Sequence, residues 1–382
     1  METDSQTDAQ EKRRIAWHRT KIDRQLLADL NQRSDFWGAL QTLGYLTTLV
    51  ATGALAWWST GHAPWYGTLA AFFLHGTCYA FIINGFHELV HSSVFRTQRL
   101  NVFFLYVLSF LGWYNPVHFW ASHTEHHKYT LHPPDDGEVV LPVYLTLKGF
   151  LRGAFVDPLG AYHRIRGTVL RGFFGHLNPG WDQVLFPPEN VEGRRRLVRW
   201  DKIMTLGHVL LVGGSLYVGW WQLPVLITLG SFYGGLLFLL CNNAQHIGLS
   251  DNVADFRLCT RTIILNPVVR FLYWHMNYHI EHHMYAGVPC YRLAELHQEL
   301  IDDMPKPRTL VGAWLEMRDT WQRQQLDPGH PLLRQLHPDP AQRRICCMLL
   351  LCCRTTPLAA MHTNRKRCCC SCWLLCCGCY CD

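Results

Sequence analysis

Residues 36–87 read FWGALQTLGYLTTLVATGALAWWSTGHAPWYGTLAAFFLHGTCYAFIINGFH and contain no aspartate, glutamate, lysine or arginine. A second charge-free stretch runs from Ile203 to Ser250. A membrane-spanning helix needs about 20 apolar residues, so each stretch is long enough for two spans. Soluble cores are not built from charge-free runs of this length. The sequence therefore predicts an all-α integral membrane protein with two transmembrane hairpins, which makes about four spans.

Turn residues interrupt each stretch once. Gly61 and Pro64 break the first stretch, and Pro224 breaks the second. The predicted spans are residues 36–58, 65–83, 203–221 and 225–241. Tryptophans lie beside both breaks, where an interfacial aromatic belt would place them: Trp57, Trp58, Trp65, Trp220 and Trp221.

Basic residues flank the hairpins and are missing from the two turns. They are Arg19, Lys21, Arg24 and Arg33 before the first hairpin, Arg96 and Arg99 after it, Arg194, Arg195, Arg196, Arg199 and Lys202 before the second, and Arg257 and Arg261 after it. Lysine and arginine favour the cytosolic side of a membrane, so both hairpins are predicted to start and finish there. The net charge of +6 is modest and gives no case for a nucleic-acid partner.

The segment between the hairpins is apolar near residues 101–120 but is interrupted by Asn115 and Pro116. We expect a surface or re-entrant segment there, because the helix would be too short for a fifth span. Residues 139–200 suit a cytosolic loop with a surface helix. After Pro289, apolar residues recur at helical spacing, which predicts one more amphipathic helix.

The ends of the chain are polar or rich in cysteine. Residues 1–35 suit a cytosolic tail, residues 36–304 form the predicted membrane domain, and residues 305–345 form a polar extension that we expect to be disordered beyond about residue 323. Twelve of the 16 cysteines lie in the tail 346–382, without the paired spacing of a zinc site. Palmitoylation of this tail is one interpretation and an extension without function is the other, so no role is assigned to it.

Three histidine clusters lie on the predicted cytosolic side. They are HELVH at 87–91, HTEHH at 123–127 and HIEHH at 279–283. Positions i, i+3 and i+4 share one face of a helix, so each cluster would present its imidazoles together. The eight histidines are His87, His91, His123, His126, His127, His279, His282 and His283. One zinc takes about four ligands, so eight suit two metals, although imidazole alone does not name the metal.

The order and spacing of these clusters resemble the histidine boxes of the membrane fatty acid desaturases and related hydroxylases. The resemblance runs from Phe36 to Met304. It implies a cytosolic helical cap that carries a di-metal histidine site above the spans. It also implies a non-haem di-iron centre that uses dioxygen to remove hydrogen from a fatty acyl chain or related lipid.

The resemblance also implies a ligand set. The eight box histidines are the implied iron ligands. Asn242 and His246 match an Asn-x-x-x-His element that precedes the third box in acyl-CoA desaturases. His246 is therefore the ninth implied ligand, and Asn242 is implied to act on the metal through a water molecule.

Two other functions remain open at this point. The same di-iron centre serves hydroxylases and epoxidases of lipids or specialised metabolites, and box sequences do not separate these reactions. A zinc-dependent membrane hydrolase or receptor would need only about four ligands, so the histidine count speaks against it.

The sequence has no haem motif of the cytochrome b5 type and no G-x-G-x-x-G fingerprint. The resemblance therefore implies a separate electron carrier, either cytochrome b5 or a ferredoxin with its reductase. The expected partners are this carrier, the bilayer and a lipid or acyl substrate. The expected location is a membrane with the site facing the cytosol, the endoplasmic reticulum if the source is eukaryotic.

Overall fold

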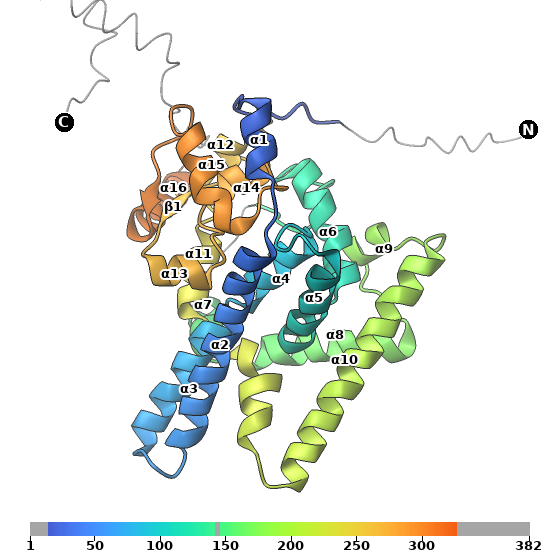
Figure 1. Cartoon of the computed structure of the whole chain (residues 1–382). Helices are drawn as coiled ribbons and strands as arrows, with labels where there is room; N and C mark the ends of the chain where they lie inside the picture. The colour runs from blue at the N-terminus through green and yellow to red at the C-terminus, as the bar shows by residue number, and fades with distance from the viewer. Residues whose placement is uncertain (1–13, 142–145, 327–382) are drawn as a thin grey trace, which may run out of the picture. The chain divides into compact units, whose positions relative to one another are not determined.

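The computed structural model describes residues 14–141 and 146–326, and helices make up most of this part of the chain (Figure 1). The cysteine-rich tail 346–382 lies outside the described residues, so its prediction stays untested. A large apolar core lies among α4 (Ile82–Val90), α14 (His279–Met284), α15 (Leu293–Leu300) and the helices around them. Two of these helices, α4 and α14, also carry histidines of the first and third clusters.

The first predicted hairpin is present. α2 (Asp35–Ser59) is preceded by Ser34, whose side chain caps the helix by accepting a hydrogen bond from the backbone N–H of Trp37. α3 (Trp65–Tyr79) returns beside α2 and continues, after a short break, into α4 (Ile82–Val90) (Figure 1). Polar groups between the arms are paired, as in the bond from Tyr45 Oη to the carbonyl of Cys78 at 2.9 Å.

The second predicted hairpin is only partly as expected. Its first arm belongs to one long helix, α10 (Val191–Tyr217). Its second arm is broken into the π-helix η1 (Pro224–Thr228), the 3-10 helix η2 (Gly230–Phe232) and α11 (Leu236–Asn243). Gly234 has a φ of +69° and lies so close to α3 that a Cβ would be 2.7 Å from the backbone nitrogen of Thr77.

Two described helices are long and apolar enough to cross a membrane. They are α2 and the combined helix from Trp65 to Val90, which is α3 with α4. A third candidate is α5 (Gln98–Gly112) with α6 (Pro116–Tyr129), which meet at a bend of 100°. The prediction of four spans is therefore not confirmed by helix length and composition.

The bend between α5 and α6 agrees with the interruption expected from the sequence. Trp113 adopts a left-handed φ of 58° at the end of α5. Asn115 then caps α6 by accepting hydrogen bonds from the N–H groups of Val117 and His118, and Pro116 occupies the first turn. This sharp turn directs α6 and its histidines toward α4.

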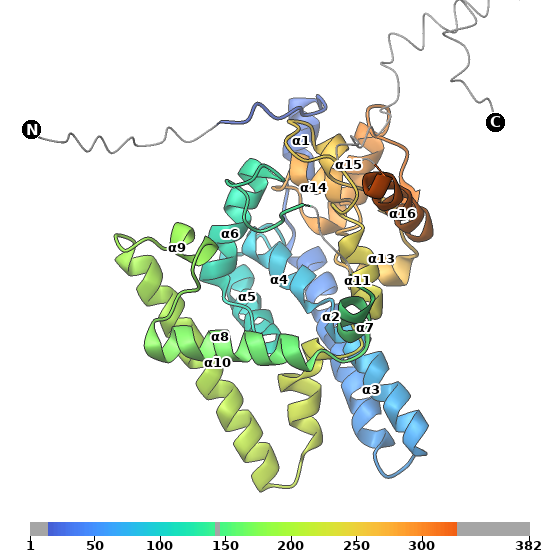
Figure 2. The same cartoon turned by 180° about the vertical axis from the view of Figure 1, so that it is seen from behind.

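Short helices fill the region predicted as loop and surface helix. They are α7 (Leu147–Phe155), α8 (Pro158–Phe174) and α9 (Trp181–Leu185). α8 crosses α10 near Gly172 (Figure 2), and Arg171 forms an ion pair with Asp201 at 2.8 Å.

The C-terminal part of the described chain packs against the helices that carry the histidine clusters. Its elements are α12 (Phe256–Cys259), β1 (Ile263–Ile264), α13 (Pro267–Leu272), α14 (His279–Met284), η3 (Cys290–Arg292), α15 (Leu293–Leu300), β2 (Arg308–Thr309) and α16 (Leu310–Leu326). β1 and β2 form a parallel pair. In α16, Ala313 packs with Ala244 and Ile263, and Trp314 donates to the carbonyl of Leu240. The predicted end of the membrane domain at residue 304 therefore lies before β2 and α16, although β2 pairs with β1 and α16 packs against Ala244 and Ile263.

Candidate metal centre

All nine predicted ligand histidines lie together. They come from four places in the chain: the end of α4, the length of α6, the turn after α11, and α14. His91 and His127 are partly exposed, and the other seven are buried. Helical spacing explains the local arrangement, because positions i, i+3 and i+4 of α6 and of α14 face the same way.

The nitrogens form two groups. The first contains His87, His91, His123, His127 and His282, and the second contains His126, His246 and His283. Within each group, one nitrogen from every histidine lies within 4.8 Å of the others. His279 joins the second group, because its Nε2 is 2.9 Å from Nε2 of His246 and 3.1 Å from Nε2 of His283.

Many of the Nε2 atoms face one another. In the first group, Nε2 of His123 is 2.7 Å from that of His87 and 2.9 Å from that of His127. Nε2 of His282 is 3.2 Å from that of His127. Neutral imidazoles at this spacing bring lone pairs together unless a proton or a metal ion lies between them.

The Nδ1 atoms of several of these histidines face outward to oxygen. Nδ1 of His123 lies 2.8 Å from Glu138, and Nδ1 of His126 lies 2.8 Å from Asp136. Nδ1 of His246 lies 3.0 Å from the carbonyl oxygen of Cys259. An imidazole that donates from Nδ1 presents the lone pair of Nε2, which is the arrangement found around protein-bound metals. The residues present therefore fit two metal ions.

Burial favours the neutral form of most imidazoles of this centre. It lowers the pKa of His279 and His283 well below the ordinary value, and it lowers the pKa of His246 to about 3. Metals bind neutral imidazole, so these groups need lose no proton near neutral pH before they bind.

At His126 burial is outweighed by the hydrogen bond to Asp136 and by the charges of Glu138 and Asp136, so its net pKa is raised. Burial raises the pKa of Asp136, but the hydrogen bonds from His126 and two backbone N–H groups outweigh it, so its net pKa is lowered. Asp136 therefore stays ionised as a partner.

The family comparison agrees with this geometry. The family model for fatty acid desaturases matches residues 63–313, a range that includes all three histidine boxes. The chain belongs to the fatty acid desaturase family. A search of curated proteins gave no match. Membership indicates an oxidoreductase of lipid-type substrates, and α2 with α3–α4 indicates association with a membrane.

The sequence reasoning missed the acidic partners of this desaturase-family site. Asp136 and Glu138 come from the loop HPPDDGEVV at 132–140. The loop folds back on α6 because Asp136 accepts hydrogen bonds from the N–H groups of Leu131 and Glu138. The available signal was three acids within four positions, beginning eight residues after the second box ends at His127.

Glu281 of the third box forms no described hydrogen bond with the nine predicted ligand histidines. It is fully buried, and it accepts a hydrogen bond from Thr262 at 2.6 Å and pairs with Nδ1 of His297 at 2.5 Å. These contacts join the short helix α14 to the segment before β1 and to α15. Glu281 and His297 therefore support the site region from outside the set of predicted ligands.

Asn242 differs from the other predicted site residues. It lies near the end of α11, one turn before His246, and its side chain is exposed. None of the hydrogen bonds described for residues 14–141 and 146–326 joins its side chain to the histidines. Its predicted action through water stays a prediction.

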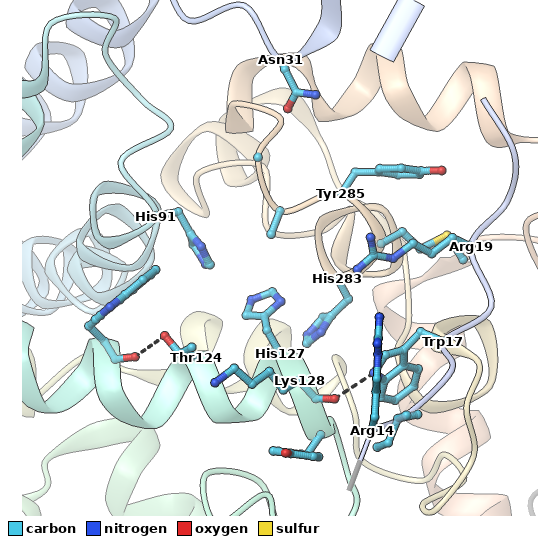
Figure 3. Close-up of a pocket in the computed structure, with 16 residues that line it drawn as sticks. Arg14, Trp17, Arg19, Asn31, His91, Thr124, His127, Lys128, His283 and Tyr285 are labelled. Carbon is cyan, nitrogen blue, oxygen red and sulfur yellow. Dashed lines mark hydrogen bonds between the residues drawn. The ribbon is translucent and has the colours of Figure 1, made fainter. Parts of the chain in front are cut away.

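A cavity of about 800 Å³ opens beside the desaturase-family histidines. His91, His127 and His283 line it, and Arg14, Trp17 and Arg19 of the N-terminal segment also line it (Figure 3). Trp17 stacks on Phe256 at 4.1 Å and donates to the carbonyl of Lys128 at 2.9 Å. The N-terminal segment thus forms part of the wall of the cavity next to the candidate metal centre.

Proposed function

We propose that the protein is a membrane-bound non-haem di-iron oxidoreductase. It uses dioxygen and externally supplied electrons to desaturate a fatty acyl chain or a related lipid. The observation that carries this proposal is the meeting of nine imidazoles in two groups, with facing Nε2 atoms, in a chain of the fatty acid desaturase family.

The two groups would each hold one iron. His87, His91, His123, His127 and His282 would hold the first iron, and His126, His246, His279 and His283 would hold the second. Asn242 would act on the second iron through water. A bound pair of irons would supply the activation of dioxygen that the removal of hydrogen from an unactivated carbon requires. Nine imidazoles exceed the needs of one zinc, which supports this assignment over a zinc hydrolase or receptor.

The residues around the histidines orient them and exclude water. Glu138 and Asp136 accept hydrogen bonds from Nδ1 of His123 and His126, which fixes the tilt and tautomer of both rings. Phe119 stacks on His123 with ring centres 5.0 Å apart, and the fully buried Phe86 packs against Phe119. This apolar lining keeps water from one side of the centre, which favours reaction at a C–H bond.

We propose the following membrane arrangement on the basis of the charge pattern. Four spans, in two hairpins, enter and leave on the cytosolic side, where a helical cap carries the metal site. The membrane domain spans residues 36–304, with the tail 1–35 and the extensions 305–345 and 346–382 outside it. In a eukaryote the membrane would be the endoplasmic reticulum, and a separate carrier, cytochrome b5 or a ferredoxin with its reductase, would supply electrons.

The test compares total lipids from cells that express the intact chain, its His283→Ala variant or a His62→Ala control. His62 is exposed beside the first turn and lies outside the site. We expect a lipid that loses two hydrogens with the intact chain and with His62→Ala, but not with His283→Ala. A lipid that gains one oxygen instead would establish a hydroxylase or epoxidase. Zinc in place of iron in the purified protein would overturn the proposal.

A further inference from the structure

A second cavity lies away from the histidines. The end of α8, the loop that follows it and the first turn of α10 enclose about 800 Å³. Arg166, His176 and Arg194 line it together with Leu170 and Phe174, and none of the described residues that line it is acidic. No hydrogen bond or ion pair described within residues 14–141 and 146–326 involves the guanidinium of Arg166. The cavity therefore offers positive charge beside an apolar wall.

Arg194 is held in a fixed position at this cavity. Its Nε and Nη2 donate to the carbonyl oxygen of Phe186 at 2.9 and 2.6 Å. The described hydrogen bonds do not use its Nη1, so one edge of the guanidinium stays available to a ligand. Arginine binds phosphate oxygens well because its planar group presents several donors at once.

The outer surface of α8, and of α7 before it in the chain, is apolar and basic. Leu147 and Phe155 of α7, and Tyr162 and Phe174 of α8, are exposed, with Leu147 at 73% and Phe174 at 75%. Residues 147–174 contain five basic residues and one acid. A helix with large apolar side chains on its outer face and lysine or arginine beside them is typical of one that lies in a membrane interface.

The contact between α8 and α10 places α8 at the predicted membrane surface. Gly172 lies so close to α10 that its Cβ would be 3.0 Å from the backbone nitrogen of Lys202. Lys202 is the last charged residue before the charge-free stretch that begins at Ile203. α8 therefore crosses α10 where the charged part of that helix meets its apolar part (Figure 2). Arg194 lies about 12 Å from Lys202 along the charged part of α10, because a helix rises about 1.5 Å per residue.

We propose that this second cavity binds the phosphate headgroup of an anionic phospholipid from the adjacent leaflet. Arg166 and Arg194 bind the phosphate, and Leu170 and Phe174 lie along the start of the acyl chains. The lipid is a bound partner that anchors α8 and α10 at the membrane surface. This site depends on membrane insertion but not on the reaction at the histidines.

The test uses the full chain in nanodiscs of phosphatidylcholine and phosphatidylglycerol in equal amounts. Native mass spectrometry then counts the phospholipids that stay bound after transfer to detergent. We expect the wild type to retain phosphatidylglycerol in preference. Arg166→Gln should lower this retention about tenfold, because a charge-assisted hydrogen bond to the bound phosphate is lost. The matched control is Arg199→Gln, because Arg199 is exposed on α10 and does not line the cavity.

A wild type without preference for phosphatidylglycerol would overturn the site, as would equal losses in Arg166→Gln and Arg199→Gln. If Arg166→Gln does not assemble, Phe174→Ser tests the apolar wall and should also lower retention. Inorganic pyrophosphate distinguishes the sources of phosphate. If it displaces phosphatidylglycerol from the wild type and binds in discs of phosphatidylcholine alone, the cavity serves a soluble phosphate ligand and the lipid proposal fails.

Discussion

The carboxylate of Glu138 accepts a hydrogen bond from Nδ1 of His123 at 2.8 Å, and its second oxygen accepts one from the hydroxyl of Ser122 at 2.7 Å. Glu138 therefore holds the ring of His123 from the side opposite to the other histidines. Groups that orient a metal-bound histidine in this way set the affinity of the metal.

Replacement of Glu138 by alanine should weaken metal binding without removing a ligand. We expect Glu138→Ala to lose between about tenfold and 100-fold in iron affinity, because the ring of His123 is no longer held in position. Iron content after dialysis against a graded chelator would measure the loss. Glu125→Ala is the control, since Glu125 pairs only with the exposed Lys128 among the described contacts. Equal iron retention in both variants would show that Glu138 does not orient a ligand.

The buried pair of Glu281 and His297 should stabilise the third box. His297→Ala leaves the fully buried Glu281 without one of its partners, and a buried polar group left unpaired costs about 1–3 kcal/mol. We expect a lower thermal midpoint in detergent, together with weaker iron binding because α14 loses its link to α15. His163→Ala, at an exposed position of α8 that lines neither cavity, should leave both quantities unchanged. A midpoint equal to the wild type in His297→Ala would contradict this account.

The sequence predicted the parts of this molecule that depend on local spacing. The absence of charged residues over 36–87 was enough to predict the first hairpin, because the thickness of the bilayer fixes how many apolar residues a spanning helix needs. The i, i+3, i+4 spacing of His123, His126 and His127 fixes them on one face wherever the helix lies. The family resemblance added His246, which the structure brings within 2.9 Å of His279.

Features that depend on distant contacts could not be predicted in this way. The second arm of the second hairpin is broken where Gly234 meets Thr77, and no local pattern shows that approach. Asp136 became a partner of His126 only because its loop folds back on α6. Trp314 reaches the carbonyl of Leu240 from beyond the predicted domain boundary, because a helix in a polar extension can still bury one face.

The attachment of the N-terminal segment should depend on pH through Asp303. This carboxylate accepts a hydrogen bond from Thr20 at 2.6 Å and lies 3.2 Å from Nε2 of His18. Burial raises the pKa of Asp303, but these two hydrogen bonds and the charge of Arg257 outweigh it, so the net pKa lies below the ordinary value of 3.8.

A folded pKa below the unfolded one gives stability that is present above the unfolded pKa and is lost as the pH falls through the folded pKa. We therefore expect the N-terminal segment to detach below about pH 4, near the ordinary pKa of aspartate. Limited proteolysis near Arg19 at graded pH would follow this detachment. Asp303→Asn should be cleaved faster at neutral pH and should lose the dependence on pH. A wild type whose cleavage does not change in acid would rule out this role of Asp303.

The glycine at position 234 should be required by the contact between the two hairpins. Its φ of +69° is unfavourable for any residue with a Cβ, and that Cβ would lie 2.7 Å from the backbone nitrogen of Thr77 and 2.8 Å from the carbonyl oxygen of Phe73. Backbone atoms on α3 cannot move aside without shifting the helix. Gly234→Ala should therefore lower the thermal midpoint in detergent and increase aggregation. Gly213→Ala in α10 is the matched control, because nothing lies within 4 Å of its added Cβ and alanine favours a helix by up to about 1 kcal/mol over glycine. We expect that variant to match or exceed the wild type, and equal midpoints for Gly234→Ala and Gly213→Ala would show that the second hairpin does not pack against α3 at this point.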